Sequence, residues 1–518
     1  MDRAKDRHFE GSKTPGRRPG GSDFLQLDLR EAPPGSRTER LTARIRAAIA
    51  DGTLPLGSRL PPSRVLAAEL GVSRGVVTEA YQRLADAGQV QGRGRAGTTV
   101  AAAPLPPAAP PAPLPPAPPA PPAAAPADRL VPARSGEPGA PLRTGAGEAL
   151  VDALRSVPCR IDLSPGVPDL TAFPRSAWLQ AERRVLGALT AGDFGYGNPQ
   201  GAPALRTAVA GWLARNRGIR ADPGEIVVVA GVAQALALVA YVLRESGVRR
   251  VAVEDPGSLG ARQQLEHGRL ETVPVPVDEG GLDTAALRAS GAPAVLLTPA
   301  HQFPTGVVLD GERRRELLGW AADGGLVVED DYDAEHRYDR APVPALRALL
   351  PEGVCYAGSV SKLLAPALRL GWLLVPPRLR DAVVTAKRYA DLGNPVLAQL
   401  VLARLMDSGE LERHLRHVRR RHRRRRDAML RAITAHLPGA RVHGAAAGLH
   451  LMVTFDGAAF EDTALAARAL ALGVKAHPLS WHRVRPGPPG LVLGYAAGPP
   501  GELEEGVALL GRALTRLG

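Results

Sequence analysis

Cysteine is scarce in this chain: among its 518 residues there are two, Cys159 and Cys355, and they lie far apart. Two distant cysteines exclude a disulfide framework and a zinc site built from cysteines. Such sparse use of cysteine is typical of a reducing compartment, so we expect a cytoplasmic protein.

Long apolar runs are missing too, because no run reaches the roughly 20 residues that span a bilayer. The first residues, MDRAKDRHFE, are charged and precede no apolar core, so we expect neither a signal peptide nor a membrane partner. Positive charge, in contrast, is in excess, with a net charge of +13. This excess favours contact with polyanions, although a coding bias toward arginine would also explain it.

Composition divides the chain into four segments. Residues 1–36 are rich in Gly, Pro and charge, which predicts a disordered tail. Residues 37–101 carry a compact helical pattern, and residues 148–518 carry a longer folded pattern. Residues 102–147 between them are predicted to be a linker, since residues 101–127 contain 13 prolines, which block helix and sheet. As polyproline II this run spans up to about 80 Å, and a ligand for another domain is the alternative to a spacer.

The segment 37–101 has the pattern of three helices and a hairpin. Apolar residues recur at helical spacing over Arg40–Ala50, a second helix starts at Ser63, and Ser73 can cap a third. A tight turn at Gly71 separates the second and third helices, and Val90–Val100 reads as a two-stranded wing. This order predicts a winged helix-turn-helix that binds double-stranded DNA.

The stretch GSRLPPSRVLAAELGVSRGVVTEAYQRL closely resembles the DNA-binding domain of the GntR family. The resemblance implies that Arg64 and Arg74 contact DNA, that Ser73 contacts a phosphate, and that Arg93 and Arg95 lie in the wing. The whole segment has ten Arg and five acidic residues, and guanidinium groups pair with phosphates and guanine edges. A solvated basic helix pair is the weaker alternative.

From residue 148 onward, short β-rich runs alternate with helical stretches, which predicts an α/β fold with a parallel sheet covered on both faces. We expect a smaller C-terminal α+β part from about Gln399. The expected strands include Ile226–Ala230, Arg250–Glu254, Ala294–Thr298, Leu326–Glu329 and Gly353–Ala357.

A lysine, two hydroxyls and an arginine occur together in GSVSKLLAPALRLGW. The amine of Lys362 suits a Schiff base with an aldehyde cofactor, whereas a lone lysine is more often a solvated surface charge. Ser359, Ser361 and Arg369 suit the phosphate of such a cofactor.

A second motif, VVEDDYDAE, places carboxylates at the end of a strand. A buried carboxylate there can keep a pyridine nitrogen protonated, and a tyrosine two residues on can bond the ring hydroxyl. A helix cap and a metal-like acidic cluster are the alternatives. Three further motifs are YGNPQGAPALR, TPAHQFPTG and GVAQ, which opens a helix whose amino end is an anion site.

These five motifs occur in the order found in fold-type I aminotransferases, and with the GntR-like head they resemble the MocR/GabR family of regulators. The resemblance covers almost the whole chain from about Arg37 and implies a cofactor, pyridoxal phosphate, and a head-to-tail homodimer. It assigns Lys362 as the Schiff-base lysine, Asp330 as the partner of the pyridine nitrogen and Tyr332 as the partner of the ring hydroxyl. The implied phosphate ligands are Ser359, Ser361, Arg369, the amides of Val232 and Ala233, and Tyr196 from the neighbouring subunit.

Two positions depart from this pattern. Ser258 stands where the family usually has a tyrosine stacked on the cofactor ring, and Val492 stands where aminotransferases have the arginine that binds the substrate carboxylate. Arg483 and Arg485 are candidates to replace that arginine. Elsewhere, eight of the eleven residues 416–426 are arginine; we expect the solvated face of a long helix there, with a second DNA contact as the alternative.

The sequence therefore predicts a pyridoxal-phosphate-binding transcription regulator with a weakly active or inactive aminotransferase-like body. Pyridoxal phosphate, alone or with an amine or amino-acid effector, would shift the head-to-body arrangement and hence the DNA affinity. An active aminotransferase with an accessory DNA-binding head is the alternative. A cofactor-free scaffold is a third possibility, which the intact set of Lys362, Asp330 and Arg369 argues against.

Overall fold

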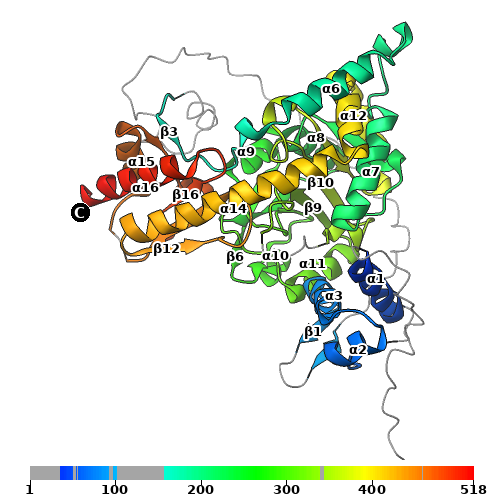
Figure 1. Ribbon diagram of the computed structural model, residues 1–518, viewed down its shortest axis with the longest axis horizontal. Helices are drawn as coiled ribbons and strands as arrows, with labels where there is room; N and C mark the ends of the chain where they lie inside the picture. The colour runs from blue at the N-terminus through cyan, green and yellow to red at the C-terminus, as the bar shows by residue number, and fades with distance from the viewer. Residues whose placement is uncertain are drawn as a thin grey trace, which may run out of the picture. The chain divides into compact units, whose positions relative to one another are not determined.

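The computed structural model describes residues 36–50, 54, 57–92, 97–101, 157–338, 344–457 and 459–517 (Figure 1). The chain separates into two compact units, residues 1–104 and 105–518, which we call the head and the body. Residues 1–35 of the expected tail and the whole expected linker lie outside the described residues.

The head consists of three helices and a hairpin. Leu41 and Ile45 of the first helix and Val77 of the third are buried in one apolar cluster. The Tyr81 hydroxyl donates to the carbonyl oxygen of Pro61 at 2.8 Å, which fixes the turn before the second helix onto the third. The two strands pair antiparallel, so the predicted winged helix-turn-helix is confirmed. The elements are α1 (Arg37–Ala50), α2 (Ser63–Glu69), α3 (Arg74–Asp86), β1 (Val90–Gly92) and β2 (Thr98–Val100).

A mixed eight-stranded sheet forms the centre of the body. Its order is β4-β11-β10-β9-β8-β5-β6-β7, in which β11 runs antiparallel to both neighbours and β7 antiparallel to β6. The strands are β4 (Ile226–Val229), β5 (Arg250–Asp255), β6 (Glu271–Asp278), β7 (Gly281–Leu282), β8 (Ala294–Leu297), β9 (Leu326–Asp331), β10 (Val354–Ser359) and β11 (Gly371–Leu374).

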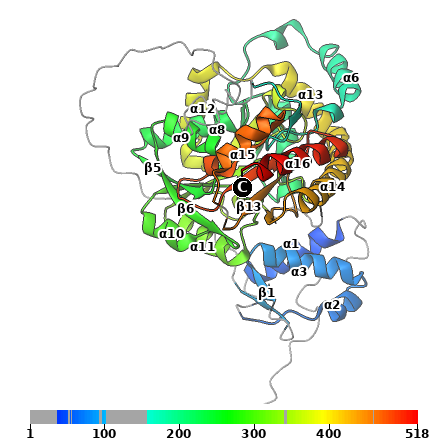
Figure 2. The ribbon, with the colours of Figure 1, turned by 90° about the vertical axis from the view of Figure 1, so that its left-hand side faces the viewer.

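Helices cover both faces of this sheet because its strands are apolar on both sides. In β4, Val227 and Val229 pack with α8, α9 and α12, whereas Ile226 and Val228 pack with α7 and α13 on the other face. Helices α10 and α11 cover the same face as α7 farther along the sheet (Figures 1 and 2). The bounds are α6 (Arg175–Leu186), α7 (Pro203–Arg217), α8 (Val232–Glu245), α9 (Leu259–His267), α10 (Thr284–Ser290), α11 (Gly311–Ala322), α12 (Pro377–Asp391) and α13 (Val396–Asp407).

The C-terminal part of the body is a four-stranded antiparallel sheet, of order β12-β13-β16-β15, with three helices. It begins at α14, not at about Gln399 as expected, because α13 packs against α6 and α7. Strand β3 joins it by pairing with β14. The bounds are α14 (Glu410–His436), α15 (Asp462–Ala471), α16 (Pro500–Thr515), β3 (Ile161–Asp162), β12 (Ala440–His443), β13 (His450–Phe455), β14 (Val474–Lys475), β15 (His477–Pro478) and β16 (Gly490–Gly494).

Two differences from the sequence prediction concern the sheet. It is not wholly parallel, since β11 inserts antiparallel between β10 and β4. Strand β6 forms despite Pro274 and Pro276 within it. Short 3-10 helices connect the larger elements: η3 (Leu170–Ala172), η4 (Ala191–Phe194), η5 (Pro223–Glu225), η6 (Leu346–Ala348), η7 (Pro366–Leu368) and η8 (Leu479–His482).

In the part of the chain that the structure describes, no helix combines the length and apolar character needed to cross a membrane. Both cysteines are free thiols, with Cys355 buried in β10.

Candidate functional site

A cavity of about 630 Å³ lies where the carboxyl ends of β9 and β10 meet the amino ends of α8 and α9. Polar atoms gather at one edge of an α/β sheet because parallel strands end there together. The lining residues named by the sequence motifs are Val232, Ala233, Ser258, Asp330, Tyr332, Ser359, Ser361, Lys362 and Arg369. Gly166, Thr298, Phe303 and several residues of α9 complete the wall.

Lys362 lies in the turn that follows β10. Its ammonium group donates a hydrogen bond to the carbonyl oxygen of Gly166, a residue far away in sequence. The carbonyl of Lys362 lies 3.1 Å from the Nε2 atom of His336, which must donate because a carbonyl only accepts. The backbone that carries the amine is therefore held by His336, and Lys362 lines the cavity.

Asp330, near the end of β9, is a buried carboxylate whose Oδ1 atom has no hydrogen-bond partner among the described residues. Burial, followed by the neighbouring carboxylates Asp331 and Asp333, raises the pKa of Asp330 to about 7. A cationic N–H group facing Oδ1 would supply both the missing hydrogen bond and the missing charge. A protonated pyridine nitrogen is such a group, so this carboxylate fits pyridoxal phosphate.

The other end of the cavity suits a phosphate. The hydroxyls of Ser359 and Ser361 lie 2.8 Å apart, and the guanidinium of Arg369 donates to the carbonyl of Ala230. Helix α8 starts beside them without a side-chain cap, so its first amides can bind an anion. Gly231 precedes this helix at a φ of 88°, and a Cβ there would lie 3.4 Å from the Arg369 guanidinium. Glycine thus allows the helix and the arginine to converge.

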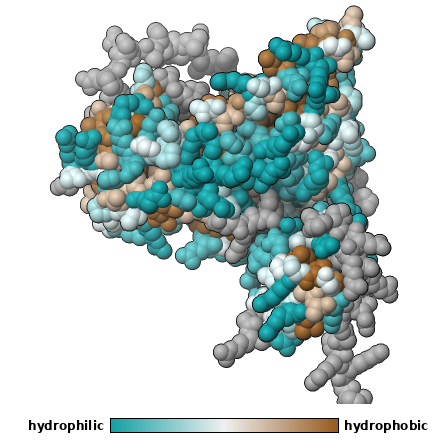
Figure 3. Space-filling view, viewed as in Figure 1, coloured by the Kyte–Doolittle hydropathy of each residue, from teal (hydrophilic) through white to brown (hydrophobic). Residues whose placement is uncertain are grey.

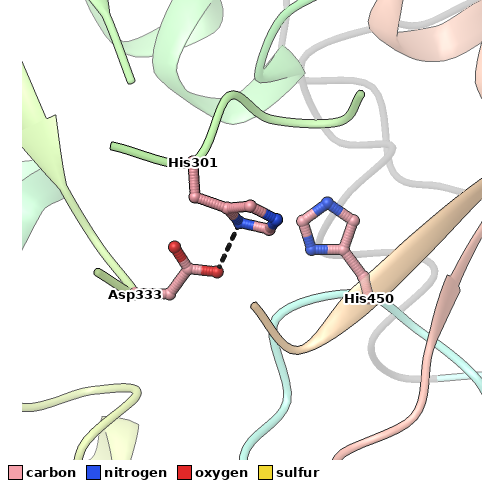
Figure 4. A group of neighbouring side chains, drawn as sticks. All are labelled: His301, Asp333 and His450. Carbon is pink, nitrogen blue, oxygen red and sulfur yellow. Dashed lines mark hydrogen bonds and ion pairs between the residues drawn. The ribbon is translucent and has the colours of Figure 1, made fainter. Parts of the chain in front are cut away.

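Tyr332 lines the cavity next to a group of three buried side chains, His301, Asp333 and His450 (Figure 4). The Nδ1 atom of His301 lies 3.0 Å from the Tyr332 hydroxyl and 2.9 Å from Oδ2 of Asp333. Burial and the carboxylates of Asp333 and Asp330 raise the pKa of Tyr332, so the phenol stays protonated.

The same three side chains have the composition of a metal site, since their ligand atoms all lie within 4.8 Å of one another. The fold brings both histidines to Asp333 although neither is close to the acidic motif in sequence. His301 belongs to the TPAHQFPTG motif, where it had no assigned role, and His450 belongs to no motif.

The two departures from the aminotransferase pattern are visible in the structure. Ser258 lines the cavity and caps α9, its hydroxyl accepting from the Ala261 amide at 3.3 Å. Val492 is fully buried in a small apolar cluster with Met452 and Leu479, against which Phe303 packs.

Neither arginine proposed as a substitute lines the cavity. Arg483 donates to the carbonyl of Pro488 at 2.5 Å, and Arg485 donates to the carbonyl of Pro274 at 3.3 Å. Among the described lining residues, Lys362 and Arg369 are the lysine and arginine side chains. The cavity of this chain therefore offers a substrate carboxylate no arginine beyond the one at the phosphate end.

Tyr196 does not line the cavity of its own chain, and its side chain is 95% exposed.

In the head, three of the residues expected to contact DNA, Arg64, Ser73 and Arg74, lie around the start of α3. Arg64 and Arg74 are exposed, and the Nε atom of Arg74 donates to the Ser63 hydroxyl at 3.4 Å. Ser73 occupies the capping position of α3 but makes no side-chain capping bond, contrary to the role its sequence position predicts. Arg93 and Arg95 lie outside the described residues.

The arginine-rich run lies on α14, the long helix that crosses the face shown in Figure 1, and Figure 3 shows a hydrophilic band there. Its exposed members are Arg416, Arg420, Arg423 and Arg424. Other members are structural: Arg421 and Arg425 pair with the buried Asp169 at 2.6 and 3.0 Å, and Arg419 donates to the Glu335 carbonyl at 2.6 Å. The helix prediction is confirmed, although only part of the run is a solvated face.

Comparison with known families agrees with this division. Residues 160–509 match the family of class I and II aminotransferases, and residues 37–100 match the gntR family of bacterial regulatory proteins. The fold and the site thus define a gntR-type DNA-binding head fused to a fold-type I aminotransferase-like body, a fold that implies binding of pyridoxal phosphate.

The similarity to known regulators extends over most of their length. The chain is 33% identical to the "Probable rhizopine catabolism regulatory protein MocR" of Rhizobium meliloti, covering 92% of this chain and 94% of that protein. It is also 33% identical to the pyridoxine biosynthesis transcriptional regulator PdxR of Corynebacterium glutamicum, covering 83% and 86%. This chain belongs to the MocR/GabR family of regulators.

Among solved structures, the body is similar to LysN, an α-aminoadipate aminotransferase of Thermus thermophilus, complexed with N-(5'-phosphopyridoxyl)-L-leucine. The two are 29% identical with a TM-score of 0.64, over 74% of this chain and 97% of LysN. Family membership makes this chain a DNA-binding transcription regulator with an aminotransferase-like domain.

Proposed function

We propose that this regulator binds pyridoxal phosphate in its body and responds to it, alone or with an amine or amino acid, by changing its affinity for DNA. One observation carries the proposal: a lysine amine, a buried carboxylate oxygen without a partner and the amino end of a helix meet in one cavity. These three features match the aldehyde, the ring nitrogen and the phosphate of a single molecule.

Several of the lining residues have a proposed task. Lys362 provides the amine that attaches to the aldehyde, Asp330 holds the ring nitrogen, and Tyr332 donates to the ring hydroxyl. When bound, the cofactor supplies an electrophilic carbonyl and an electron sink. The proposed phosphate ligands are Ser359, Ser361, Arg369, the amides of Val232 and Ala233, and Tyr196 of a second subunit.

We propose that turnover is weak because the site lacks groups that orient a substrate. Transamination needs the substrate Cα–H held over the lysine, and an arginine fork on the carboxylate does this in aminotransferases. Val492 offers a buried apolar surface in its place, and Ser258 offers a hydroxyl already used as a helix cap. An amine could still react with the cofactor carbonyl in place of the Lys362 amine, but it would be held in a less defined orientation.

A head-to-tail homodimer completes the site in this proposal. The exposed position of Tyr196 means that its family role at the phosphate requires a second subunit. Large apolar side chains exposed on the body, including Leu179, Leu186 and Phe194, supply surface that such a subunit can bury. We propose residues 102–147 as the tether between the head and the body.

Two heads per dimer would read two half-sites on DNA. We propose that Arg74 and Arg64 contact bases or phosphates, that Ser73 contacts a phosphate, and that Arg93 and Arg95 act in the wing. The exposure of Arg74 at the start of α3, and of the Ser73 hydroxyl beside it, supports this assignment.

The test is operator binding by the full-length protein before and after pyridoxal phosphate is removed and restored, with and without a panel of amines. We expect the affinity to change at least about fivefold with cofactor or cofactor plus amine. The Lys362→Ala variant should bind DNA but lose the response. A wild-type affinity that ignores cofactor and amines, or a response that survives in Lys362→Ala, contradicts the proposal.

An active aminotransferase with an accessory head is the second candidate, favoured by the complete set of Lys362, Asp330 and Arg369 in the cavity. Multiple turnovers with an amino donor and a keto-acid acceptor would support it. A single slow conversion without turnover would support the regulator.

A further inference from the structure

Three buried side chains beside Tyr332 have no task in the proposed function: His301, Asp333 and His450 (Figure 4). His301 lies in the loop after β8, Asp333 follows β9, and His450 starts β13. Each of His301 and Asp333 has a side chain only 1% exposed, so their hydrogen bonds are set by each other and not by solvent.

The protonation of His450 follows from its one partner. Its Nε2 atom lies 3.2 Å from the carbonyl oxygen of Pro304, which can only accept, so Nε2 carries a proton. Burial, and then His301, lowers the pKa of His450 to about 3, so the ring is neutral. Its Nδ1 atom is therefore a bare lone pair, and this atom has no hydrogen-bond partner among the described residues.

His301 meets a carboxylate on one side and His450 on the other. Its Nδ1 atom lies 2.9 Å from Asp333 and must carry a proton to bond an ionised carboxylate. Its Nε2 atom is also buried without a partner among the described residues. The two rings are tilted by 54° to each other, with centroids 5.3 Å apart (Figure 4).

The proton on His301 limits which acceptor the Tyr332 hydroxyl can donate to. The proton on Nδ1 of His301 points at both Asp333 and the phenol oxygen, which lies 3.0 Å away. The phenol cannot then donate to His301, and its own proton is left for another acceptor. Asp333 is one such acceptor in the cofactor-free protein, and a ring oxygen in the cavity is the other.

We propose that His301 is a positioning residue: with its Nδ1 proton held by Asp333, it directs the hydroxyl proton of Tyr332 toward a ring oxygen in the cavity. The inference rests on the proposed function, because that oxygen is the ring hydroxyl oxygen of pyridoxal phosphate. It makes His301 part of the recognition of the cofactor without direct contact.

The test compares two ligands, pyridoxal phosphate and its analogue without the ring hydroxyl, by their equilibrium affinity for the cofactor-free full-length protein. We expect wild type to prefer pyridoxal phosphate by roughly tenfold or more, the size of one charge-assisted hydrogen bond. His301→Ala and Tyr332→Phe should each lose most of this preference. The double variant should show no further loss beyond Tyr332→Phe, since His301 acts through the hydroxyl.

Two further variants make the result specific. His301→Asn keeps a donor near the position of Nδ1 and should recover part of the preference if His301→Ala folds poorly. His443→Ala is the matched control. His443, on β12, lies 3.0 Å from the Thr454 hydroxyl and does not line the cavity. This variant should keep the full preference for pyridoxal phosphate.

A second readout does not require the cofactor. In nitrogen-15 NMR of histidine-labelled protein, the signal lost in His301→Asn should be that of a ring with a proton on Nδ1, and the signal lost in His450→Asn that of an Nε2–H ring. A His301 ring without a proton on Nδ1, or a wild-type preference retained in His301→Ala, overturns the inference. A stoichiometric divalent cation that disappears in His301→Ala also overturns it, by making the group a metal site. If wild type attaches neither ligand at Lys362, the proposed function itself fails, and the NMR result still tests the proton on Nδ1 of His301.

Discussion

The buried carboxylate of Asp330, whose Oδ1 atom has no hydrogen-bond partner among the described residues, should lower the free energy of unfolding of the cofactor-free protein. Asp330→Asn should therefore stabilise this form. Asp330 has a pKa of about 7 in the fold against 3.8 for an ordinary aspartate, and burial is the largest cause. Because the pKa in the fold is raised, the contribution of this group to stability is fully present below about pH 4. It is lost as the pH rises through about 7.

The size of the effect follows from the shift. A rise from 3.8 to about 7 corresponds to about 4 kcal/mol at 1.4 kcal/mol per pKa unit, an upper bound reached above pH 7. The asparagine amide would still be buried without a full set of partners, at a cost of about 1–3 kcal/mol. We expect Asp330→Asn to raise the free energy of unfolding by about 1–3 kcal/mol near pH 8, and by about 2 kcal/mol less near pH 5.

The assay is urea unfolding of cofactor-free protein followed by tryptophan fluorescence. All five tryptophans belong to the body, so the signal does not report the head: Trp178, Trp212, Trp320, Trp372 and Trp481. Added pyridoxal phosphate should reverse the order of stability, because it stabilises wild type and binds the variant weakly.

Asp331→Asn is the matched control on the same strand. This carboxylate accepts from Arg217 and Tyr356, each at 2.5 Å, so its loss removes the charged hydrogen-bond acceptor of a buried guanidinium. We expect Asp331→Asn to destabilise the protein by about 3–5 kcal/mol at both pH values. An Asp330→Asn variant that is destabilised equally at pH 5 and pH 8 would refute the reasoning.

Three other outcomes are expected. Arg369→Ala should weaken pyridoxal phosphate at least roughly tenfold in equilibrium dialysis, because a charge-assisted phosphate contact is lost; unchanged affinity would remove Arg369 from the phosphate site. Arg74→Ala should abolish specific retardation of operator DNA in a gel, and retained affinity would mean that α3 is not the reader. Ser258→Tyr with Val492→Arg should raise the rate of half-transamination in single-turnover spectroscopy, while fast conversion by wild type with any common amino acid would show that neither position limits it.

The sheet was predictable where its strands are buried on both faces. The apolar runs of β4, β8 and β10 lie within a residue or two of their expected bounds, since burial on both sides makes these strands mostly apolar. The direction of β11 was not predictable, because its four residues follow the lysine motif and the intervening turn decides their orientation.

Strand β6 was obscured by its prolines, which normally argue against a strand. Pro274 and Pro276 are two residues apart, so both missing N–H groups face the same side of the strand. Strand β7 pairs with β6 only at Val277 and Asp278. The β6–β7 pairing therefore needs no N–H group from either proline.

Much of the candidate site was predictable because its residues occupy the ends of adjacent parallel strands. Asp330 on β9 and Ser359 on β10 reach one cavity by the rule that such ends share an edge. The partners His301, His450 and Gly166 were not predictable in their roles. Each depends on a loop or strand far away in sequence, and no local pattern records that approach.

The burial of Val492 bears on how this body can differ from an enzyme. A valine exposed in the cavity could become an arginine without rearrangement, but this side chain is fully buried against Met452, Leu479 and Phe303. An arginine there would bring an unpaired charge into an apolar cluster, which is costly unless a substrate carboxylate is present. Apolar packing at Val492 therefore holds the C-terminal sheet against the Phe303 loop whether or not a ligand is bound. Valine in place of arginine at position 492 does not affect the attachment of an aldehyde at Lys362, because that attachment depends on residues carried by β9 and β10. In the proposed function such attachment without orientation would suit a regulator, since a ligand that is held and not converted would persist as a signal.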